Sequence, residues 1–232
     1  MMYATFFKRL LDLMVSLTAL LAVLPILLVL MLVGAISMKG NPFFTQPRPG
    51  KKEKDGKEKI FRLIKLRTMS NAKDENGDLL PDEKRLNKYG AWLRSTSLDE
   101  LPSLVNIVAG HLSLVGPRPQ LVRDMTFMTD EQRRRHTVRP GLTGLAQVNG
   151  RNNITWERKF EYDLQYIDSG ITFMGDVKII LQTVSKVLQR SDTVREGTVS
   201  DMDLGDCLML EGKVDQETYN QKQEEAKRLL RV

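Results

Sequence analysis

The sequence predicts a mainly helical α+β protein, in which an apolar N-terminal helix precedes a small β-hairpin and a set of short helices. Three observations support this fold class. Residues 13–38 carry no charge, two strand-like runs flank Asp55-Gly56, and residues 154–189 repeat apolar side chains at helical spacing. The sequence divides into an apolar segment (1–40), a body (41–199) and an acidic extension (200–232).

The apolar segment can cross or enter a membrane. Its 26 uncharged residues would form a helix of about 39 Å. Pro25 bends a helix, and basic residues on both flanks (Lys8, Arg9 and Lys39) draw both ends toward the cytoplasm. The residues alone leave three alternatives open: a re-entrant helix bent at Pro25, a spanning helix and a buried soluble helix.

Charge and cysteine content narrow the function classes. The net charge of +6 combines +10 on residues 1–190 with −4 on residues 191–232, which suggests that the basic part contacts anionic lipids or phosphorylated substrates. Nucleic acid is disfavoured because aromatic residues are only 6% and the basic residues are dispersed. Cys207 is the single cysteine, so an internal disulfide is excluded, and any metal must have oxygen ligands.

Periodicity and turn residues locate the elements of the body. Two strands flank Asp55-Gly56, and residues 139–150 are expected to be a turn-rich loop. The apolar stripe of the helix over 175–189 favours core packing over membrane contact when it is considered alone. His111 and His136 are expected to be exposed or capping residues without a role. The remaining helices are expected at 82–93, 99–108, 129–136, 154–166 and 216–230.

The adjacent carboxylates Asp99 and Glu100 are the strongest candidates for chemistry. A structural interpretation makes Ser97 the N-cap of a capping box with Glu100. Pro102 weakens that interpretation, because it would fall inside the helix and cost a hydrogen bond. In the functional interpretation, Asp99 attacks phosphorus and Glu100 helps to hold Mg²⁺.

Four arginines lie beside prolines, glycines or expected helix ends. Guanidinium groups on a stiff backbone suit bidentate phosphate binding, although each one alone is typical of a surface arginine. They are Arg94, Arg118, Arg139 and Arg151.

Six segments carry a resemblance to a known family. They are Phe44-Thr45-Gln46-Pro47-Arg48-Pro49-Gly50, Lys65-Leu66-Arg67-Thr68-Met69, Arg94-Ser95-Thr96-Ser97-Leu98-Asp99-Glu100-Leu101-Pro102, Ser113-Leu114-Val115-Gly116-Pro117-Arg118-Pro119, Arg139-Pro140-Gly141 and Gln147-Val148-Asn149-Gly150-Arg151. With these segments the chain resembles the monotopic phosphoglycosyl transferases, the bacterial sugar transferases that begin glycoconjugate assembly on polyprenol phosphate. The resemblance runs from about Phe7 to Thr198 and is greatest to the short form, which consists of the catalytic unit alone.

The resemblance implies a re-entrant membrane helix, amphipathic interface helices and a cytoplasmic active site at the bacterial inner membrane. By the same implication, Asp99 attacks the β-phosphate of a UDP-sugar, UMP leaves, and polyprenol (undecaprenyl) phosphate accepts the phosphosugar. Glu100 is implied as the ligand of Mg²⁺. The implied substrate-binding residues are Lys65, Arg94, Arg118, Arg151 and Asp176, and the helix that contains Asp176 is implied to lie at the membrane interface.

Some features depart from the family pattern. Leu24-Pro25 replaces the usual Ser-Pro, Gly110-His111 replaces Gly-Asp, and the acidic extension exceeds the short form. Similarity of residues 150–159 to short forms of N-glycosylation pathways favours a UDP-linked N-acetylated sugar, with a 6-deoxy diamino sugar as one such donor. The alternative function is a catalytically idle membrane scaffold that binds anionic lipid.

Overall fold

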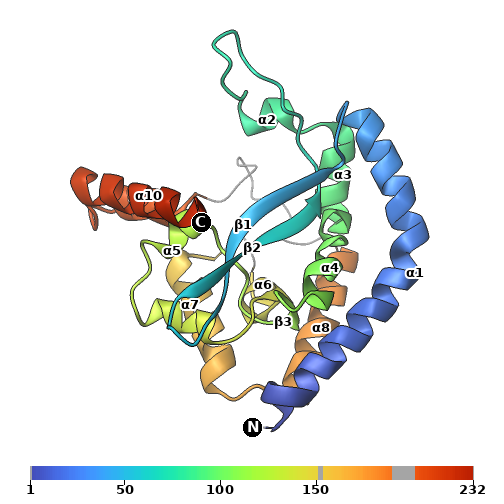
Figure 1. Ribbon diagram of the computed structural model, residues 1–232, viewed down its shortest axis with the longest axis vertical. Helices are drawn as coiled ribbons and strands as arrows, with labels where there is room; N and C mark the ends of the chain where they lie inside the picture. The colour runs from blue at the N-terminus through green and yellow to red at the C-terminus, as the bar shows by residue number, and fades with distance from the viewer. Residues whose placement is uncertain (1, 151–153, 190–201, 232) are drawn as a thin grey trace.

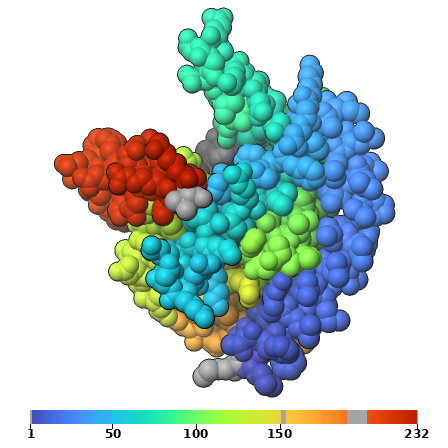
Figure 2. Space-filling model, viewed as in Figure 1, coloured from blue at the N-terminus to red at the C-terminus, as the bar shows by residue number. Residues whose placement is uncertain are grey.

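The computed structural model describes residues 2–150, 154–189 and 202–231. A long helix, α1 (Lys8–Ser37), curves along one side of a body that is built around a twisted hairpin of β1 (Phe43–Lys52) and β2 (Glu58–Leu66) (Figure 1). The segment between β2 and α2 (Asp82–Arg85) projects from the top of the molecule (Figure 2). The mainly helical α+β class predicted from the sequence is therefore confirmed.

The N-terminal helix exposes apolar side chains along its whole length. A π-helical turn at Tyr3–Phe7 leads into α1, and together they form a helix long and apolar enough to cross a membrane by length and composition. The helix continues through Pro25 but bends near its middle (Figure 1). Its large exposed side chains include Phe6, Leu10, Met14, Leu17, Leu21, Leu24, Leu28, Leu32 and Ile36.

The first half of α1 is tied to the body by polar side chains. The buried Asp12 carboxylate accepts hydrogen bonds from Ser113 Oγ at 2.7 Å and from the Leu114 backbone N–H at 3.0 Å. Arg9 donates to the carbonyls of Ile107 and Val108, at 2.6 and 2.9 Å. These bonds satisfy the free carbonyls at the end of α4 (Ser103–Val108).

The second half of α1 is tied to the same body. Asn87 Nδ2 donates to Ser37 Oγ at 2.9 Å, and the Tyr89 hydroxyl donates to the Leu30 carbonyl at 2.6 Å. Leu27 and Leu30 pack with Leu93 in one buried cluster. Both ends of α1 thus contact the body that contains the β-hairpin.

The hairpin has the strands and turn that the sequence predicts. Its strands pair antiparallel, and the register shifts between Pro49 and Lys52. Gly56 has a φ of +82°, a left-handed turn conformation in which glycine carries no Cβ penalty. On one face, Phe61 and Leu63 of β2 form a core with Leu104, Ile107 and Leu112.

Two predicted helices are shorter than expected. The helix expected at 82–93 is two helices, α2 and α3 (Lys88–Thr96), because Leu86 is extended and Asn87 accepts a capping bond from the Gly90 N–H. The helix expected from residue 99 begins at Ser103, since Pro102 has no N–H for an earlier helical bond. A 3₁₀ turn, Leu98–Glu100, fills the gap.

The loop expected at 139–150 contains regular structure. β4 (Gly141–Thr143) pairs parallel with β3 (Ser113–Val115), and α6 (Leu145–Val148) follows it. A Cβ on Gly141 would lie 2.1 Å from the Gly116 backbone N, so this pairing requires glycine. Along the chain, α5 (Val122–Met125) and the 3₁₀ helix Gln132–Thr137 come after β3 and before β4.

Helices α7 (Trp156–Asp168) and α8 (Phe173–Gln189) confirm two predicted helices within about two residues. The core interpretation of the α8 stripe is wrong, because Phe173, Val184, Leu181 and Leu188 are 50–79% exposed. The interface position that the family resemblance implied for this helix stays a prediction, with which the exposure is compatible.

The acidic extension packs against the body through α9 (Leu204–Leu210) and α10 (Gln216–Leu230), both of which contact α5. The expected boundary at residue 200 lies outside the described residues. Both Asp124 oxygens accept backbone N–H bonds at 3.0 Å, one from Leu121 and one from Leu204. Leu204 also packs with Met128, Trp156 and Phe160, so the described part of the extension shares a core with the body.

The Leu204→Ala variant should lower the free energy of unfolding by about 2–4 kcal/mol, because Leu204 is 4% exposed and its removal leaves a cavity. Leu210→Ala is the matched control. That side chain is 76% exposed, and its truncation should change stability by less than about 0.5 kcal/mol. Thermal unfolding of the detergent-solubilised variants measures both effects, and equal effects would contradict the docking.

His136 is buried, so the expectation that it is exposed or capping is wrong. It is 3% exposed, and its Nδ1 lies 3.2 Å from Glu58 Oε1, a carboxylate that Arg133 also binds. Burial lowers the pKa of His136 from 6.5 to about 4, although Glu58 acts in the opposite direction. The unfolded chain then binds more protons between these values, so the His136 contribution is complete above pH 6.5 and is lost toward pH 4.

Acidification from pH 6.5 to 4 should therefore destabilise the wild type more than His136→Gln. The full difference corresponds to about 3 kcal/mol. The carboxyls of Asp163 and Asp203, whose pKa values burial raises to about 6, titrate in the same range in both proteins. The informative quantity is thus the difference between two melting curves recorded against pH. Parallel curves would show that His136 does not titrate in this way.

Candidate active site

Asp99 and Glu100 lie on the 3₁₀ turn between α3 and α4. The capping box expected at Ser97 is absent from this turn. Ser97 ends α3 in the left-handed conformation, with φ of 56°, and its side chain makes no capping bond. The turn therefore presents the two carboxylates in the gap between two helices.

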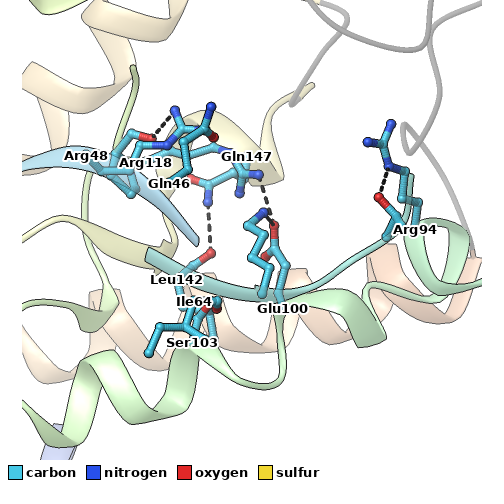
Figure 3. Close-up of polar contacts among 12 residues, drawn as sticks. Gln46, Arg48, Ile64, Arg94, Glu100, Ser103, Arg118, Leu142 and Gln147 are labelled. Carbon is cyan, nitrogen blue, oxygen red and sulfur yellow. Dashed lines mark hydrogen bonds and ion pairs between the residues drawn. The ribbon is translucent and has the colours of Figure 1, made fainter. Parts of the chain in front are cut away.

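Glu100 is the centre of an ion-pair cluster. Its Oε1 accepts hydrogen bonds from Lys65 Nζ at 2.7 Å and from Arg118 Nη2 at 2.9 Å (Figure 3). Lys65 comes from β2, and Arg118 comes from the segment after β3. Burial lowers the pKa of Lys65, and Glu100 opposes that shift. The structure thus brings together three of the residues that the sequence singled out.

Asp99 is half-buried beside the same cluster. Burial lowers the pKa of Arg94 as well as that of Lys65, and the Asp99 carboxylate opposes the shift in both cases. Arg94 donates from Nε to Thr68 Oγ1 at 3.0 Å. Figure 3 shows Arg94 on the opposite side of Glu100 from Arg118. Asp99 is therefore in the electrostatic range of basic groups that could neutralise a phosphate.

The backbone around Arg118 is held from two directions. The buried Arg135 donates to the Arg118 carbonyl at 2.6 Å and to Asp163 Oδ2 at 2.5 Å. Arg48 donates from Nη1 to the Pro119 carbonyl at 3.2 Å. These bonds fix the backbone of the segment that contains Arg118, and so they position the Arg118 side chain for its ion pair with Glu100.

An apolar cavity of about 300 Å³ opens beside Glu100 and Arg118. It lies between α1, α4, β4, α6 and α8. Most of its wall is aliphatic, and its polar groups include Glu100, Arg118 and Lys186. Aliphatic lining residues include Val15, Leu104, Leu142, Ile180 and Val184. Such a cavity suits a ligand that combines a hydrocarbon chain with an anionic group.

A divalent cation would find few protein ligands here. Within the described parts of the chain, no group of three His, Cys, Asp or Glu side chains could hold a metal ion. Asp99 and Glu100 offer hard oxygen donors, and Mg²⁺ is often held by one or two carboxylates together with substrate phosphates and water. The residues therefore fit a cation that is completed by substrate phosphate.

Three predicted substrate-binding residues are not part of the ion-pair cluster, and one of them, Arg94, lies on the other side of Glu100. Asp176 is buried elsewhere, where it accepts hydrogen bonds from the Tyr3 hydroxyl at 2.8 Å, from Lys8 Nζ at 2.6 Å and from the Tyr166 hydroxyl at 2.8 Å. In this position Asp176 joins α8 to the N-terminal helix. Arg151 lies outside the described residues.

Arg48 lies beside the ion-pair cluster, although the sequence analysis did not single it out. Together with Lys65, Glu100 and Arg118 it lines a second, small cavity. The sequence feature that could have identified Arg48 is its position between Pro47 and Pro49. Arg118 was singled out because it lies in the same stiff context, between two prolines.

Comparison with known proteins gives consistent matches. The family described as "Bacterial sugar transferase" matches residues 3–190. The "Uncharacterized sugar transferase EpsL" of Bacillus subtilis (strain 168) is 47% identical over 181 residues, which are 78% of this chain and 87% of that protein.

Two longer relatives share a printed activity. A "UDP-glucose:undecaprenyl-phosphate glucose-1-phosphate transferase" of Klebsiella pneumoniae is 41% identical over 189 residues, which are 78% of this chain and 40% of the relative. A protein with the same name in Escherichia coli (strain K12) is 35% identical over 188 residues, with coverage of 77% and 39%. The chain therefore spans less than half the length of these two relatives.

Proposed function

The chain belongs to the bacterial sugar transferase family, and on this basis we propose that it transfers a phosphosugar from a UDP-sugar to polyprenol phosphate. One observation carries the proposal. The Lys65–Glu100–Arg118 cluster lies beside Asp99 and opens onto an apolar cavity, so phosphate-binding groups meet a site for a hydrocarbon chain. The named activity of the Klebsiella and Escherichia relatives supports the same substrates.

In the proposed reaction, the Asp99 carboxylate attacks the β-phosphorus of the donor. The bond between that phosphorus and the bridging oxygen breaks, UMP leaves with the bond electrons, and the phosphosugar remains on Asp99 as an acyl phosphate. An oxygen of polyprenol phosphate then attacks the same phosphorus and releases the Asp99 carboxylate. Lys65, Arg94 and Arg118 neutralise the phosphates in both steps.

Mg²⁺ is proposed as the cofactor, and Glu100 would be its principal protein ligand. When it is bound, the cation supplies Lewis-acid neutralisation of the phosphate charge. Lys65 and Arg118 meanwhile bind the Glu100 carboxylate and orient it at the edge of the cavity.

We also propose that the protein is monotopic, with a re-entrant α1, on the cytoplasmic face of a bacterial inner membrane. A straight spanning helix would place its ends on opposite sides of the membrane, whereas Asp12 and Asn87 tie both halves of α1 to one body. The bend near Pro25 and the apolar surface of α1 are compatible with entry and exit through one face.

Cysteine labelling tests this topology. In a Cys207→Ser background, Met2→Cys and Lys39→Cys should both react with an impermeant maleimide in inverted vesicles and neither should react in spheroplasts. Reaction of the two positions from opposite sides would establish a spanning helix.

Measurement of UMP release from a panel of UDP-sugars, with undecaprenyl phosphate and Mg²⁺, tests the reaction class. We propose an N-acetylated donor, from the similarity of residues 150–159 to N-glycosylation enzymes. Turnover of UDP-glucose alone would overturn the sugar but not the class. Release of UMP from none of the donors, with intact binding to anionic vesicles, would instead favour the idle scaffold.

A further inference from the structure

The Arg48 side chain is half-buried, and its guanidinium has no matching negative charge. It donates from Nη2 to Gln46 Oε1 at 2.6 Å and from Nη1 to the Pro119 carbonyl at 3.2 Å, and its buried Nε has no partner. Among the residues that the structure describes, Arg48 forms no ion pair with a carboxylate. A half-buried cation that has a buried donor without a partner and no carboxylate partner loses part of its hydration without full compensation, so its presence calls for an explanation.

Nearby carboxylates are already engaged. Glu100 binds Lys65 and Arg118. Asp124 uses both oxygens for backbone N–H groups, and Asp203 pairs with Arg123. Burial and, to a smaller extent, the Arg118 charge together lower the pKa of Arg48 to about 10. The local charge balance is therefore positive.

The small cavity between these groups has the size and lining for an anion's oxygen. Its volume is about 20 Å³, and the lining side chains include Arg48, Lys65, Glu100 and Arg118. About 10–15 Å³ is enough for one water-sized oxygen. Three cations and one carboxylate thus surround a space that can hold a single oxygen atom.

A purely structural role explains these facts less well. The bond to the Pro119 carbonyl could position the Arg118 segment, but a neutral amide could make such a bond without the cost of burying a charge. Arginine is favoured over an amide where a phosphate must be bound, because its charge and fork of donors match phosphate oxygens.

We propose that Arg48 is a substrate-binding residue that binds a non-bridging phosphate oxygen in this cavity. The inference rests on the proposed function, since the phosphate belongs either to the UDP-sugar or to polyprenol phosphate. A filled cavity would balance the charge of Arg48, Lys65 and Arg118.

Ligand-dependent thermal stabilisation tests the binding role directly. UMP, sodium pyrophosphate and undecaprenyl phosphate are added separately to the detergent-solubilised wild type, Arg48→Gln and Arg48→Lys. At least one ligand should raise the wild-type melting temperature, the effect should nearly vanish in Arg48→Gln, and Arg48→Lys should be intermediate. Without ligand, Arg48→Gln should melt at or above the wild-type temperature.

Arg62→Gln is the matched control, because Arg62 lies on the paired strand of the same hairpin with an exposed side chain. It should keep the wild-type response. If Arg48→Gln is destabilised without ligand but retains the full ligand response, Arg48 is structural and the proposal is overturned. Absence of any ligand response in the wild type also overturns it. If Arg48→Gln does not fold, a full response in Arg48→Lys decides against the proposal.

Steady-state kinetics identify the source of the phosphate. In Arg48→Gln, KM should rise about 10- to 100-fold for one substrate, the UDP-sugar or the polyprenol phosphate, in line with the loss of a charged hydrogen bond. An unchanged KM for both substrates overturns the proposal. A wild type that binds pyrophosphate through Arg48 but turns over no UDP-sugar would refute the proposed function and leave the anion site intact.

Discussion

The Asp99→Asn variant should release UMP on the order of 10³-fold more slowly than the wild type, or not at all. Asparagine keeps the size of the side chain, but its neutral amide is a poor nucleophile and cannot form the acyl phosphate. The assay is UMP release from the preferred UDP-sugar with undecaprenyl phosphate. Because Asp99 lies at a half-buried turn, the variant should retain the wild-type melting temperature to within a few degrees.

The matched control for this change is Asp78→Asn, an exposed carboxylate in the loop before α2. Its rate should equal that of the wild type. Turnover at the wild-type rate by Asp99→Asn itself would show that Asp99 is not the nucleophile, whatever the sugar.

The Glu100→Gln variant has the second largest expected effect, a fall in kcat of about 10²- to 10³-fold. The amide can still accept hydrogen bonds from Lys65 and Arg118, but it no longer balances their charge. Burial already lowers the pKa of Lys65, so loss of Glu100 should lower it further and weaken phosphate binding at alkaline pH. The pH dependence of kcat/KM measures this effect.

A magnesium titration separates the proposed metal role of Glu100 from its ion-pair role. The Mg²⁺ concentration for half-maximal activity should rise in Glu100→Gln and stay constant in Glu75→Gln, an exposed carboxylate outside the site. A lower kcat with an unchanged Mg²⁺ requirement would leave Glu100 with the ion-pair role alone.

Local signals in the sequence predicted the elements that depend on local chemistry. Asp55-Gly56 located the hairpin turn, and the apolar stripe at helical spacing located α8. The errors at 82–93 and 99–108 arose at single residues. Asn87 starts a new helix within a continuous periodic pattern, and Pro102 delays the start of α4.

Features that depend on distant segments could not be predicted in this way. The β3–β4 pairing joins two runs of three residues, which are too short for a periodic signal. The burial of Asp12 under β3, and that of Leu204 against Trp156, depend on how separate segments dock. An exposed apolar face, as on α8, has the same period as a buried one, so periodicity alone cannot distinguish membrane contact from core packing.

The residues of the candidate site could be predicted from the sequence, but their arrangement could not, because it also depends on distant segments. Asp99, Glu100, Lys65 and Arg118 were singled out by residue type and by resemblance, and the ion-pair cluster links the last three. The position of Arg48 beside the cluster became evident only from the fold, because it depends on contact between β1 and the distant segment that follows Arg118.

The central claim is a covalent phosphosugar on Asp99, and intact-protein mass spectrometry tests it most directly. Wild-type protein incubated with its UDP-sugar and Mg²⁺, without lipid, should gain the mass of one phosphosugar, and the peptide that contains Asp99 should carry it. Addition of undecaprenyl phosphate should remove that mass. If UMP forms only when both substrates are present and no mass gain occurs at any time, the acceptor attacks the donor directly and the covalent mechanism is wrong.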